Sequence, residues 1–309
     1  MPVAARTRSS HPATPPPAEG KASRCVVCGG TSEQVVLREG SYEGRLCGCG
    51  SVYTHPLPAA GTIDFTDDSH PPESYASSAP FKAAWMARHS PPGRLLEVGC
   101  GRGSFLAAAR GHGYEVCGLE PHPDRAAACE ALGIPVRREL LEETTLPPGS
   151  FDVVYHCDML SHFVDPRESL RRMAALLRPG GVLCFEAGLL ACVASGWHRV
   201  IREVGLDHHL WLYTAPTLRR LIEESGLEIV ASQTFGLIPH IFAGRAAAAA
   251  NKVAGRGLAA TRTEAGRRLA RRVDAWHYRV RHLLRYPIGA HAPRTGPQTV
   301  LFVARPRGA

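Results

Sequence analysis

The sequence predicts an α/β fold in which a mostly parallel sheet carries helices on both faces, joined to a small cysteine-rich unit near the N-terminus. Two observations predict the sheet. Short apolar runs alternate with helical stretches from residue 81 onward, and a glycine-rich turn follows the first of these runs. A third observation, four cysteines within residues 23–58, predicts the separate unit.

The chain has 309 residues, enough for one large domain and one small unit. We expect six segments: 1–22 (proline-rich disordered leader), 23–58 (cysteine-rich unit), 59–80 (linker), 81–240 (core), 241–296 (basic helical insertion) and 297–309 (last core strand and tail). No apolar run of about 18 residues predicts a membrane span, and the leader lacks the apolar stretch of a secretory signal. Ten cysteines without an export signal therefore indicate a cytoplasmic protein.

Each predicted strand is a short apolar run bounded by glycine, proline or a charged residue. Strands are expected at Arg94–Val98, Tyr114–Leu119, Phe151–Tyr155, Val182–Ala187, Leu227–Gln233 and Gln298–Ala304. Helices are expected at Ser104–Arg110, Pro123–Leu132, Pro166–Leu177 and Thr217–Glu224. Proline suits the first turn of two of these helices, and the Pro179-Gly180-Gly181 stretch is expected to end the third.

Positive charge is concentrated in one segment of the chain. Residues 245–294 carry a net charge of +10, and the whole chain carries +8, so the remainder of the chain carries −2. This uneven distribution argues against a general nucleic-acid binder. Apolar residues recur at helical spacing within this segment, at Leu269, Val273, Trp276, Val280 and Leu283. We expect a basic amphipathic helix near residues 262–286. It packs on the core, covers an anionic substrate or contacts an anionic membrane surface.

The central motif is the stretch LLEVGCGRGSF, which contains Gly99, Gly101 and Gly103. Glycines let the backbone turn sharply and approach a ligand closely, and the following helix adds free N–H groups. Glu120, at the end of the next strand, can accept hydrogen bonds from both ribose hydroxyls. Glu97, before the loop, suits an ammonium group and would repel a pyrophosphate. The motif therefore predicts a nucleoside that carries an amino acid, and the alternative is a purely structural turn.

Four segments in order resemble class I S-adenosylmethionine (SAM)-dependent methyltransferases. These segments are the glycine loop with Glu97, the strand end at Glu120, Phe151–Pro166 and Leu176–Glu186. The resemblance implies a Rossmann-like sheet of seven strands, SAM as the cofactor and methyl transfer as the reaction. It also implies a set of residues that contact SAM: Glu97, Gly99, Cys100, Gly101, Gly103, Glu120, Leu141 and His156, with Cys157 as the alternative to His156.

Cys25, Cys28, Cys47 and Cys49 approximate the spacing of a zinc ribbon, except that one residue instead of two separates the second pair. Four thiolates suit tetrahedral zinc, which would stabilise a unit too small to bury its own core. His55 is a nearby substitute ligand, and buried thiols without a metal are the alternative. Joined to this core, the unit resembles that of sugar C-methyltransferases of antibiotic pathways and of related natural-product and cell-envelope enzymes.

Methyl transfer requires the acceptor to lose a proton, and histidine is suited to accept it near neutral pH. The resembled group has an Asp-Glu-His element before an aromatic residue. Asp207–Thr214 (DHHLWLYT) is similar, with His208 in place of the glutamate and His209 at the family histidine. We expect His209 as the principal base. His162 and Tyr75 are further catalytic candidates because both match family positions, and the alternative for each residue is a structural role.

These expectations lead to one principal function and two alternatives. The principal function is SAM-dependent methylation of a small molecule, such as a nucleotide-activated sugar or a secondary metabolite. The first alternative is a zinc-containing RNA methyltransferase or nucleic-acid-binding module. It is disfavoured because three glutamates balance the three arginines of residues 23–58. The second is a scaffold that binds the cofactor without catalysis. The sequence carries no signal for an oligomeric state.

Overall fold

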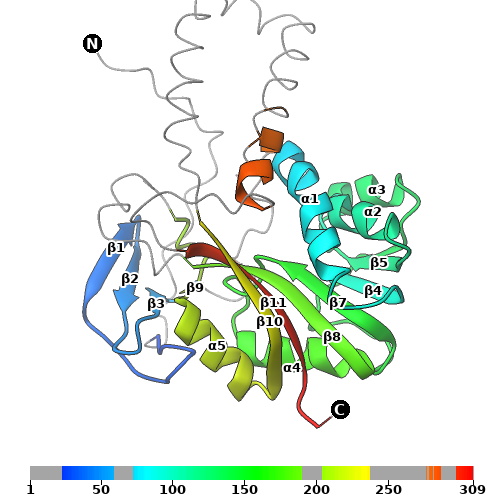
Figure 1. Ribbon diagram of the computed structural model, residues 1–309. Helices are drawn as coiled ribbons and strands as arrows, with labels where there is room; N and C mark the ends of the chain where they lie inside the picture. The colour runs from blue at the N-terminus through cyan, green and yellow to red at the C-terminus, as the bar shows by residue number, and fades with distance from the viewer. Residues whose placement is uncertain are drawn as a thin grey trace, which may run out of the picture.

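The computed structural model describes residues 23–58, 72–189, 204–236, 276, 278–280, 282–286 and 297–308. Within these residues a seven-stranded sheet lies beside a four-stranded sheet (Figure 1). The expected leader, residues 59–71 of the expected linker and most of the expected insertion fall outside the described residues.

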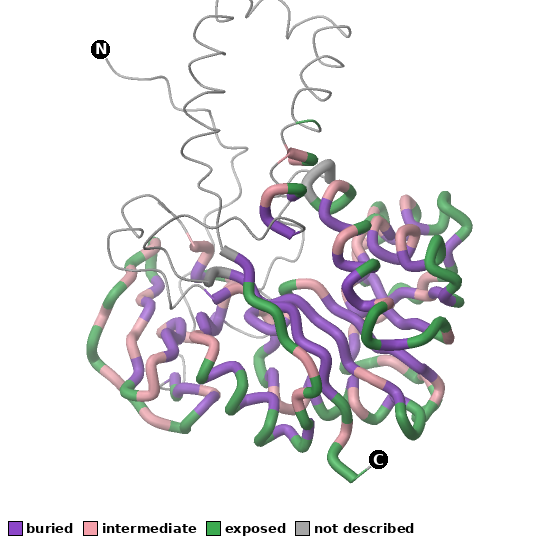
Figure 2. Tube along the Cα trace, viewed as in Figure 1, coloured by how far each residue is buried: buried purple, intermediate pink, exposed green. Residues whose placement is uncertain are grey.

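The large sheet has the strand order β10-β11-β8-β7-β4-β5-β6. Its strands are β4 (Arg94–Val98), β5 (Glu115–Leu119), β6 (Val136–Arg137), β7 (Phe151–Cys157), β8 (Leu177–Gly188), β10 (Leu227–Gly236) and β11 (Pro297–Pro306). Strands β4 to β8 pair in parallel, and β11 runs antiparallel to both of its neighbours. The central strands are buried on both faces, as the purple tubes in Figure 2 show. The predicted fold class is confirmed.

Helices cover both faces of this sheet. One core cluster packs α1 (Pro72–Met86), α2 (Ser104–Arg110) and α3 (Pro123–Glu130) on one face, and another packs α4 (Pro166–Ala175) and α5 (Ala215–Glu224) on the other. Helix α4 begins where the Asp165 carboxylate accepts hydrogen bonds from two backbone N–H groups of the first turn. It ends sooner than predicted because Leu177 already pairs with Phe151. The Pro179-Gly180-Gly181 stretch therefore lies inside β8.

Helix α1 begins at Pro72, inside the segment 59–80 that the sequence predicts as a linker. The residues that it buries before residue 81, Ser78 and Ala79, are small, whereas the larger buried residues Trp85 and Met86 come later, and the helix packs against α2. Small residues bury little surface each, so they produce a weak apolar pattern. The polar and proline-rich composition around them concealed the helix.

The predicted boundaries imply that the cysteine-rich unit is complete within residues 23–58. In the structure its sheet also includes a strand from the core. Its sheet consists of β1 (Val35–Glu39), β2 (Tyr42–Leu46), β3 (Val52–His55) and β9 (Trp211–Leu212). The fourth strand, β9, comes from the core and pairs antiparallel with β3. In addition, the Arg167 guanidinium of α4 donates hydrogen bonds to the carbonyls of Val26 and Val27, at 3.0 and 2.5 Å. The unit therefore shares one hydrophobic core with the larger domain.

The described part of the basic insertion is a helical segment within residues 276–286, beside α1 (Figure 1). Leu269 and Val273 of the predicted apolar face lie outside the described residues. For Trp276 and Leu283 the prediction is wrong, because they are 67% and 48% exposed while His282, Arg285 and Tyr286 are buried. Polar groups of the core explain this inversion. The His282 ring lies 2.8 Å from the Ser77 hydroxyl, and the Tyr286 hydroxyl donates to the Glu186 carboxylate at 3.1 Å.

Candidate active site

The glycine loop after β4 needs glycine at each of its three positions. Gly99, Gly101 and Gly103 have φ angles of 70°, 55° and 78°, in the left-handed region that other residues rarely adopt. A Cβ at Gly99 would lie 2.9 Å from the Met159 sulfur, and one at Gly103 would lie 2.6 Å from the Cys129 sulfur. A Cβ at Gly101 would meet nothing within 4 Å. The loop is therefore packed at both ends and open in the middle.

Two carboxyl groups flank the open position. The Glu120 carboxylate accepts hydrogen bonds from the backbone N–H groups of Gly101 and His122, at 2.8 and 2.9 Å. The Glu97 carboxyl is buried, and its Oε2 atom has no hydrogen-bond partner among the described residues. Burial raises the pKa of Glu97 well above its usual range, and the neighbouring Cys129 and Glu120 add to this effect. A bound ammonium group would restore the charge of Glu97 and use its unpartnered oxygen.

Two other expected cofactor residues have packing roles for their side chains. The Cys100 thiol lies beneath the loop, 4.0 Å from the Cys129 sulfur, and it occupies the space that a Cβ at Gly118 would need. Leu141 is buried in the core cluster on the α4 and α5 face of the sheet. Only the backbone of Cys100 is thus placed to face a ligand in the loop.

The His156 side chain lies on the opposite face of the sheet from Glu97. It stacks on Phe185 at 4.7 Å, and neither ring nitrogen has a hydrogen-bond partner among the described residues. Burial lowers the pKa of His156 to about 3, so the ring is neutral. This placement does not suit the His156 side chain to contact a cofactor on the Glu97 side. The alternation of strand β7 puts Cys157 on that side instead.

The structure brings the two predicted catalytic histidines together. The His162 and His209 rings lie 4.5 Å apart, and His208 lies 4.5 Å from His209. The His162 N–H donates to the Met159 carbonyl oxygen at 3.0 Å, and the Met159 sulfur would lie 2.9 Å from a Cβ at Gly99. The histidine cluster, which we define as these three residues, therefore lies close to the glycine loop.

His209 is held in a neutral form. Burial lowers its pKa well below the usual range, and the neighbouring His162 and His208 contribute to this shift. The His209 Nδ1 atom is buried and has no hydrogen-bond partner among the residues that the structure describes. The His162 Nδ1 atom lies 2.9 Å from the His208 carbonyl oxygen. A neutral imidazole with an unused nitrogen is the form that can accept a proton.

A buried ion pair, which the sequence did not predict, lies across the ends of β7 and β8. The Lys82 Nζ atom of α1 is 2.9 Å from the Glu186 carboxylate and 3.0 Å from the Cys157 sulfur. All three groups lie on the Glu97 side of the sheet, where the Tyr155 hydroxyl has no partner among the described residues. Two signals were present: Lys82 is one of three lysines in the chain, and Glu186 ends an apolar run.

Tyr75, the third catalytic candidate, lies on α1 two turns before Lys82 and on the same side of the helix. Burial, together with Cys157 and Asp158, raises the pKa of the Tyr75 hydroxyl to about 12, although 49% of the residue's surface is exposed. Tyr75 thus remains protonated near neutral pH. It is suited to donate a hydrogen bond near the end of β7 but not to act as a base.

The four cysteines of the N-terminal unit converge, with all four sulfur atoms within 4.8 Å of one another. The Cys25 and Cys49 sulfurs are 3.6 Å apart, and the Cys28 and Cys47 sulfurs are 3.3 Å apart. Four sulfur ligands about 2.3 Å from one tetrahedral zinc ion would lie about 3.8 Å apart. The His55 ring instead lies beside the Ser23 hydroxyl, at 3.2 Å, so a substitute ligand is not needed.

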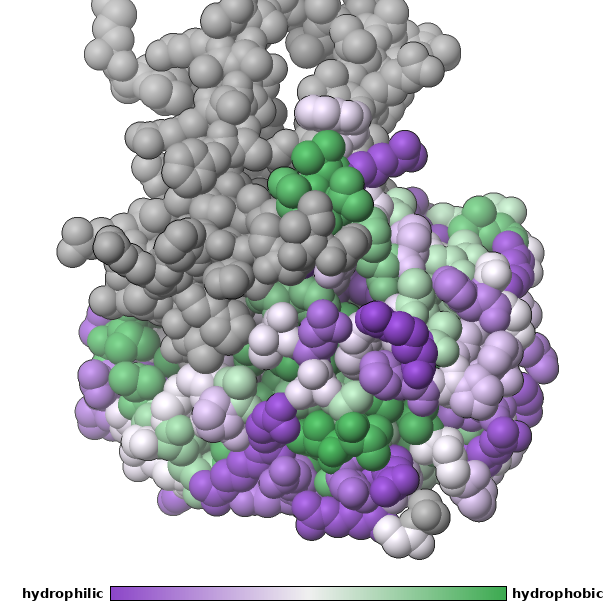
Figure 3. Space-filling model, in the orientation of Figure 1, coloured by the Kyte–Doolittle hydropathy of each residue, from purple (hydrophilic) through white to green (hydrophobic). Residues whose placement is uncertain are grey.

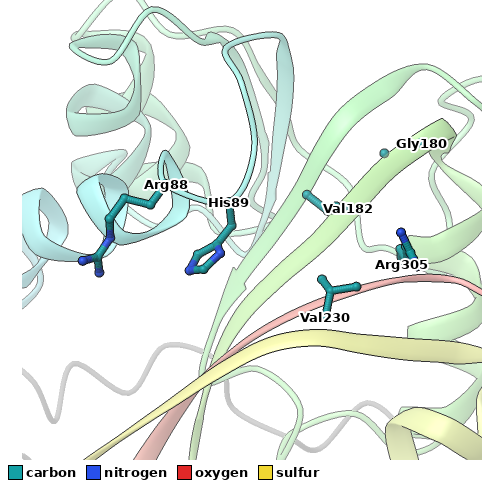
Figure 4. A pocket seen from close by; sticks show the side chains of 7 residues that line it. Arg88, His89, Gly180, Val182, Val230 and Arg305 are labelled. Carbon is teal, nitrogen blue, oxygen red and sulfur yellow. The ribbon is translucent and has the colours of Figure 1, made fainter.

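A surface hollow of about 390 Å³ lies elsewhere on the molecule, lined by Arg88, His89, Gly180, Gly181, Val182, Val230 and Arg305 (Figure 4). It is located at the amino end of β8, whereas the glycine loop and the ion pair lie at the carboxyl ends of the parallel strands. The face of the molecule drawn in Figure 3 carries hydrophilic and apolar residues side by side. We therefore do not assign the cofactor to this hollow. No helix among the described residues is long and apolar enough to cross a bilayer.

Comparisons with known proteins agree with this geometry. A family model described as a methyltransferase domain matches residues 74–232. The chain is 30% identical over 169 residues to a ubiquinone biosynthesis O-methyltransferase of Methylobacterium sp. (strain 4-46), a match that covers 50% of this chain and 67% of the relative. It is 29% identical over 166 residues to the enzyme of the same description from Thiobacillus denitrificans, covering 48% and 71%.

The solved structures that resemble the chain are distant in sequence. An S-adenosylmethionine-dependent methyltransferase from Mesorhizobium loti is 20% identical, with a TM-score of 0.44. The match covers 72% of this chain and 97% of that one. A protein described as a sarcosine dimethylglycine methyltransferase, from Galdieria sulphuraria, is 15% identical, with a TM-score of 0.48 and coverages of 72% and 84%.

Proposed function

Because the chain belongs to the class I SAM-dependent methyltransferase family, we propose that it transfers the SAM methyl group to a small molecule bound at the carboxyl ends of β7 and β8. One observation carries the proposal. The Glu120 carboxylate binds the N–H of Gly101, where the loop is open, and the loop after β7 contacts Gly99 through Met159 and carries His162 of the histidine cluster. Cofactor and base are thus on neighbouring segments.

The residues around the glycine loop fit SAM. The unpartnered Glu97 oxygen suits the ammonium group, the Glu120 carboxylate retains lone pairs for ribose hydroxyls, and the space at Gly101 admits the ligand close to the backbone. SAM supplies a methyl group on a positively charged sulfur, which a nucleophile attacks in line. The chain must then orient the acceptor and remove its proton.

We assign proton removal to His209. Its ring is neutral and has a nitrogen without a partner among the described residues, so it is able to accept a proton, while its lowered pKa makes it a weaker base than an ordinary histidine. His162 lies 4.5 Å away and orients the cluster through its contact with the His208 carbonyl. We assign to Tyr75, which is protonated on α1, a hydrogen bond donated to the acceptor.

His209→Ala is expected to bind SAM as tightly as the wild type and to lose about 10²–10⁴-fold in turnover, the usual contribution of a general base. Calorimetry measures the first quantity. The second is measured by mass spectrometry, with an acceptor found by screening metabolites for the gain of one methylene unit. His112→Ala, which removes an exposed histidine, is the control. Unchanged turnover would exclude His209 as the base, and SAM binding without any methylated product would favour the scaffold.

The acceptor class follows from charge and from the relatives. The two relatives described above are named as O-methyltransferases, which favours a hydroxyl acceptor. The cysteine-rich unit favours an acceptor such as a nucleotide-activated sugar or a secondary metabolite. An RNA acceptor is disfavoured because two of the unit's arginines, Arg38 and Arg45, are paired with glutamates of the same unit and form no basic face.

We further propose that the four cysteines bind one zinc ion, with a structural role. All four positions of a tetrahedral ion would be filled by sulfur, which leaves none for a reacting group. None of the nine cysteines in the described residues forms a disulfide, which fits the reducing cytoplasm.

Purified protein is expected to contain one zinc ion per chain by elemental analysis. Cys28→Ser should lose that zinc and lower the melting temperature, because the ion joins two loops of a small unit. Cys117→Ser, on β5 and far from the unit in sequence, is the control and should retain the metal. A wild-type protein that takes up no zinc after reconstitution would disprove the site.

A further inference from the structure

Glu39, at the end of β1, holds the loop that leads to the histidine cluster. Its carboxylate accepts hydrogen bonds from three successive backbone N–H groups, those of Val204, Gly205 and Leu206. The bonds from Gly205 and Leu206 are both 2.8 Å long. Hydrogen bonds to an ionised acceptor are about twice as strong as neutral ones, so one side chain fixes three residues of the loop.

The loop residues that Glu39 binds are the ones that fix the histidines. The backbone N–H groups of His208 and His209 donate to the Gly205 carbonyl oxygen, at 3.1 and 2.7 Å. Gly205 has a φ angle of 80°, and a Cβ there would lie 2.3 Å from the His208 ring. The turn at Gly205 therefore lets the His208 ring pack closely over the backbone that Glu39 holds.

The far side of the same loop is also fixed by the cysteine-rich unit. The Thr54 hydroxyl of β3 donates to the His209 carbonyl oxygen, and the Thr54 N–H donates to the Leu210 carbonyl oxygen, both at 2.9 Å. Strand β9 follows directly and pairs with β3. Glu39 and Thr54 thus hold the loop from both ends, although neither residue belongs to the methyltransferase domain match at residues 74–232.

We propose that Glu39 is a positioning residue for His209, so that the cysteine-rich unit sets the geometry of the base in the active site. This inference rests on the proposed function for the role of His209 as the base. The contacts among Glu39, the loop and His209 are observed independently of that role. Glu39 touches neither the glycine loop nor α1 in any described contact, so its effect is expected at the histidines and not on SAM.

The test compares Glu39→Gln and Glu39→Asp with Glu43→Gln in the full chain. Glutamine keeps the size of the side chain but loses its charge, and aspartate keeps the charge but is one methylene shorter. Glu43, on β2, pairs with Arg38 and Arg45 and not with the loop, which makes it the matched control. Hydrogen exchange of the peptide containing residues 204–210 reports the loop, and NMR of 13C-labelled histidine reports the protonation of His209.

In both Glu39 variants we expect exchange in the 204–210 peptide to become at least tenfold faster. We also expect the pKa of His209 to rise toward the ordinary histidine value as the ring becomes solvated. Calorimetric SAM affinity should stay within twofold, and Glu43→Gln should match the wild type. If Glu39→Gln does not fold, Glu39→Asp supplies the measurement. Wild-type exchange and His209 titration in a folded Glu39 variant would overturn the proposal.

The two hypotheses fail separately. If loosening the loop changes the His209 titration while His209→Ala retains full turnover, Glu39 positions His209 but the histidine is not the base. If His209→Ala loses turnover while the Glu39 variants keep the wild-type loop, the base assignment stands and the positioning role is wrong.

Discussion

Gly101→Arg is expected to abolish SAM binding, lowering the affinity by more than 100-fold in calorimetry. Gly101 has a positive φ angle, and the space beyond its missing Cβ is the one open position of the loop. Any side chain there strains the backbone, by about 1–2 kcal/mol, and an arginine would also fill the space in which the ligand must lie.

Gly149→Arg is the matched control for this substitution. Gly149 also has a positive φ angle, of 67°, and a Cβ there would likewise meet nothing within 4 Å. It lies in the turn before β7, at the opposite end of the strands from the glycine loop. Both variants should lose similar stability, and only Gly101→Arg should lose SAM. An affinity within threefold of the wild type for Gly101→Arg would show that the cofactor lies elsewhere.

Lys82→Met is expected to lower the free energy of unfolding by about 3–5 kcal/mol at neutral pH, because it removes the cation that pairs directly with the buried Glu186 carboxylate. Burial tends to raise the pKa of Glu186, but Lys82 and Arg285 hold it below the usual value. In the wild type this stability is present above the unfolded-state pKa and decreases as the pH falls through the folded-state pKa. In the variant the pKa of Glu186 rises, so the deficit should shrink toward acidic pH.

Urea denaturation at several pH values measures this effect. Arg305→Met is the control, since it breaks an exposed pair with Glu228 and should cost at most about 1 kcal/mol. The double variant Lys82→Met with Glu186→Leu removes both charges and should recover much of the loss. A deficit for Lys82→Met that equals that of Arg305→Met, or that grows toward acidic pH, would contradict the assignment of a buried ion pair.

The elements with local signals were predicted well. The bounds of β4 and α2 agree with the prediction because glycines separate an apolar strand from a helix over a few residues. The cysteine cluster was predicted for a similar reason, since metal-type spacing is a local pattern. By contrast, the first part of α1 was missed, because the residues that it buries before residue 81, Ser78 and Ala79, are small and carry little apolar signal.

The contacts between distant segments could not be predicted. Nothing in the sequence near Lys82 indicates that Glu186, more than 100 residues later, is its partner. The sequence of β7 shows that His156 and Cys157 point to opposite faces of the sheet. Which face lies on the Glu97 side depends on how β7 pairs with β4, so the sequence alone could not choose between the two residues. The sequence offered His162 and His209 as separate candidates and did not predict their contact, because the two loops are joined by a long-range hydrogen bond from the Leu210 N–H to the Ser161 carbonyl oxygen.

The late origin of β9 has a consequence for how the protein is made. Residues 23–58 leave the ribosome long before Trp211 and Leu212 exist, so the edge of β3 stays uncovered while about 150 further residues are synthesised. Metal capture by the nascent chain would compact the cysteine loops in that interval but could not complete the sheet. We expect the isolated N-terminal fragment to aggregate through the uncovered edge of β3. A peptide with the β9 sequence, added to the fragment, should cover that edge and reduce the aggregation.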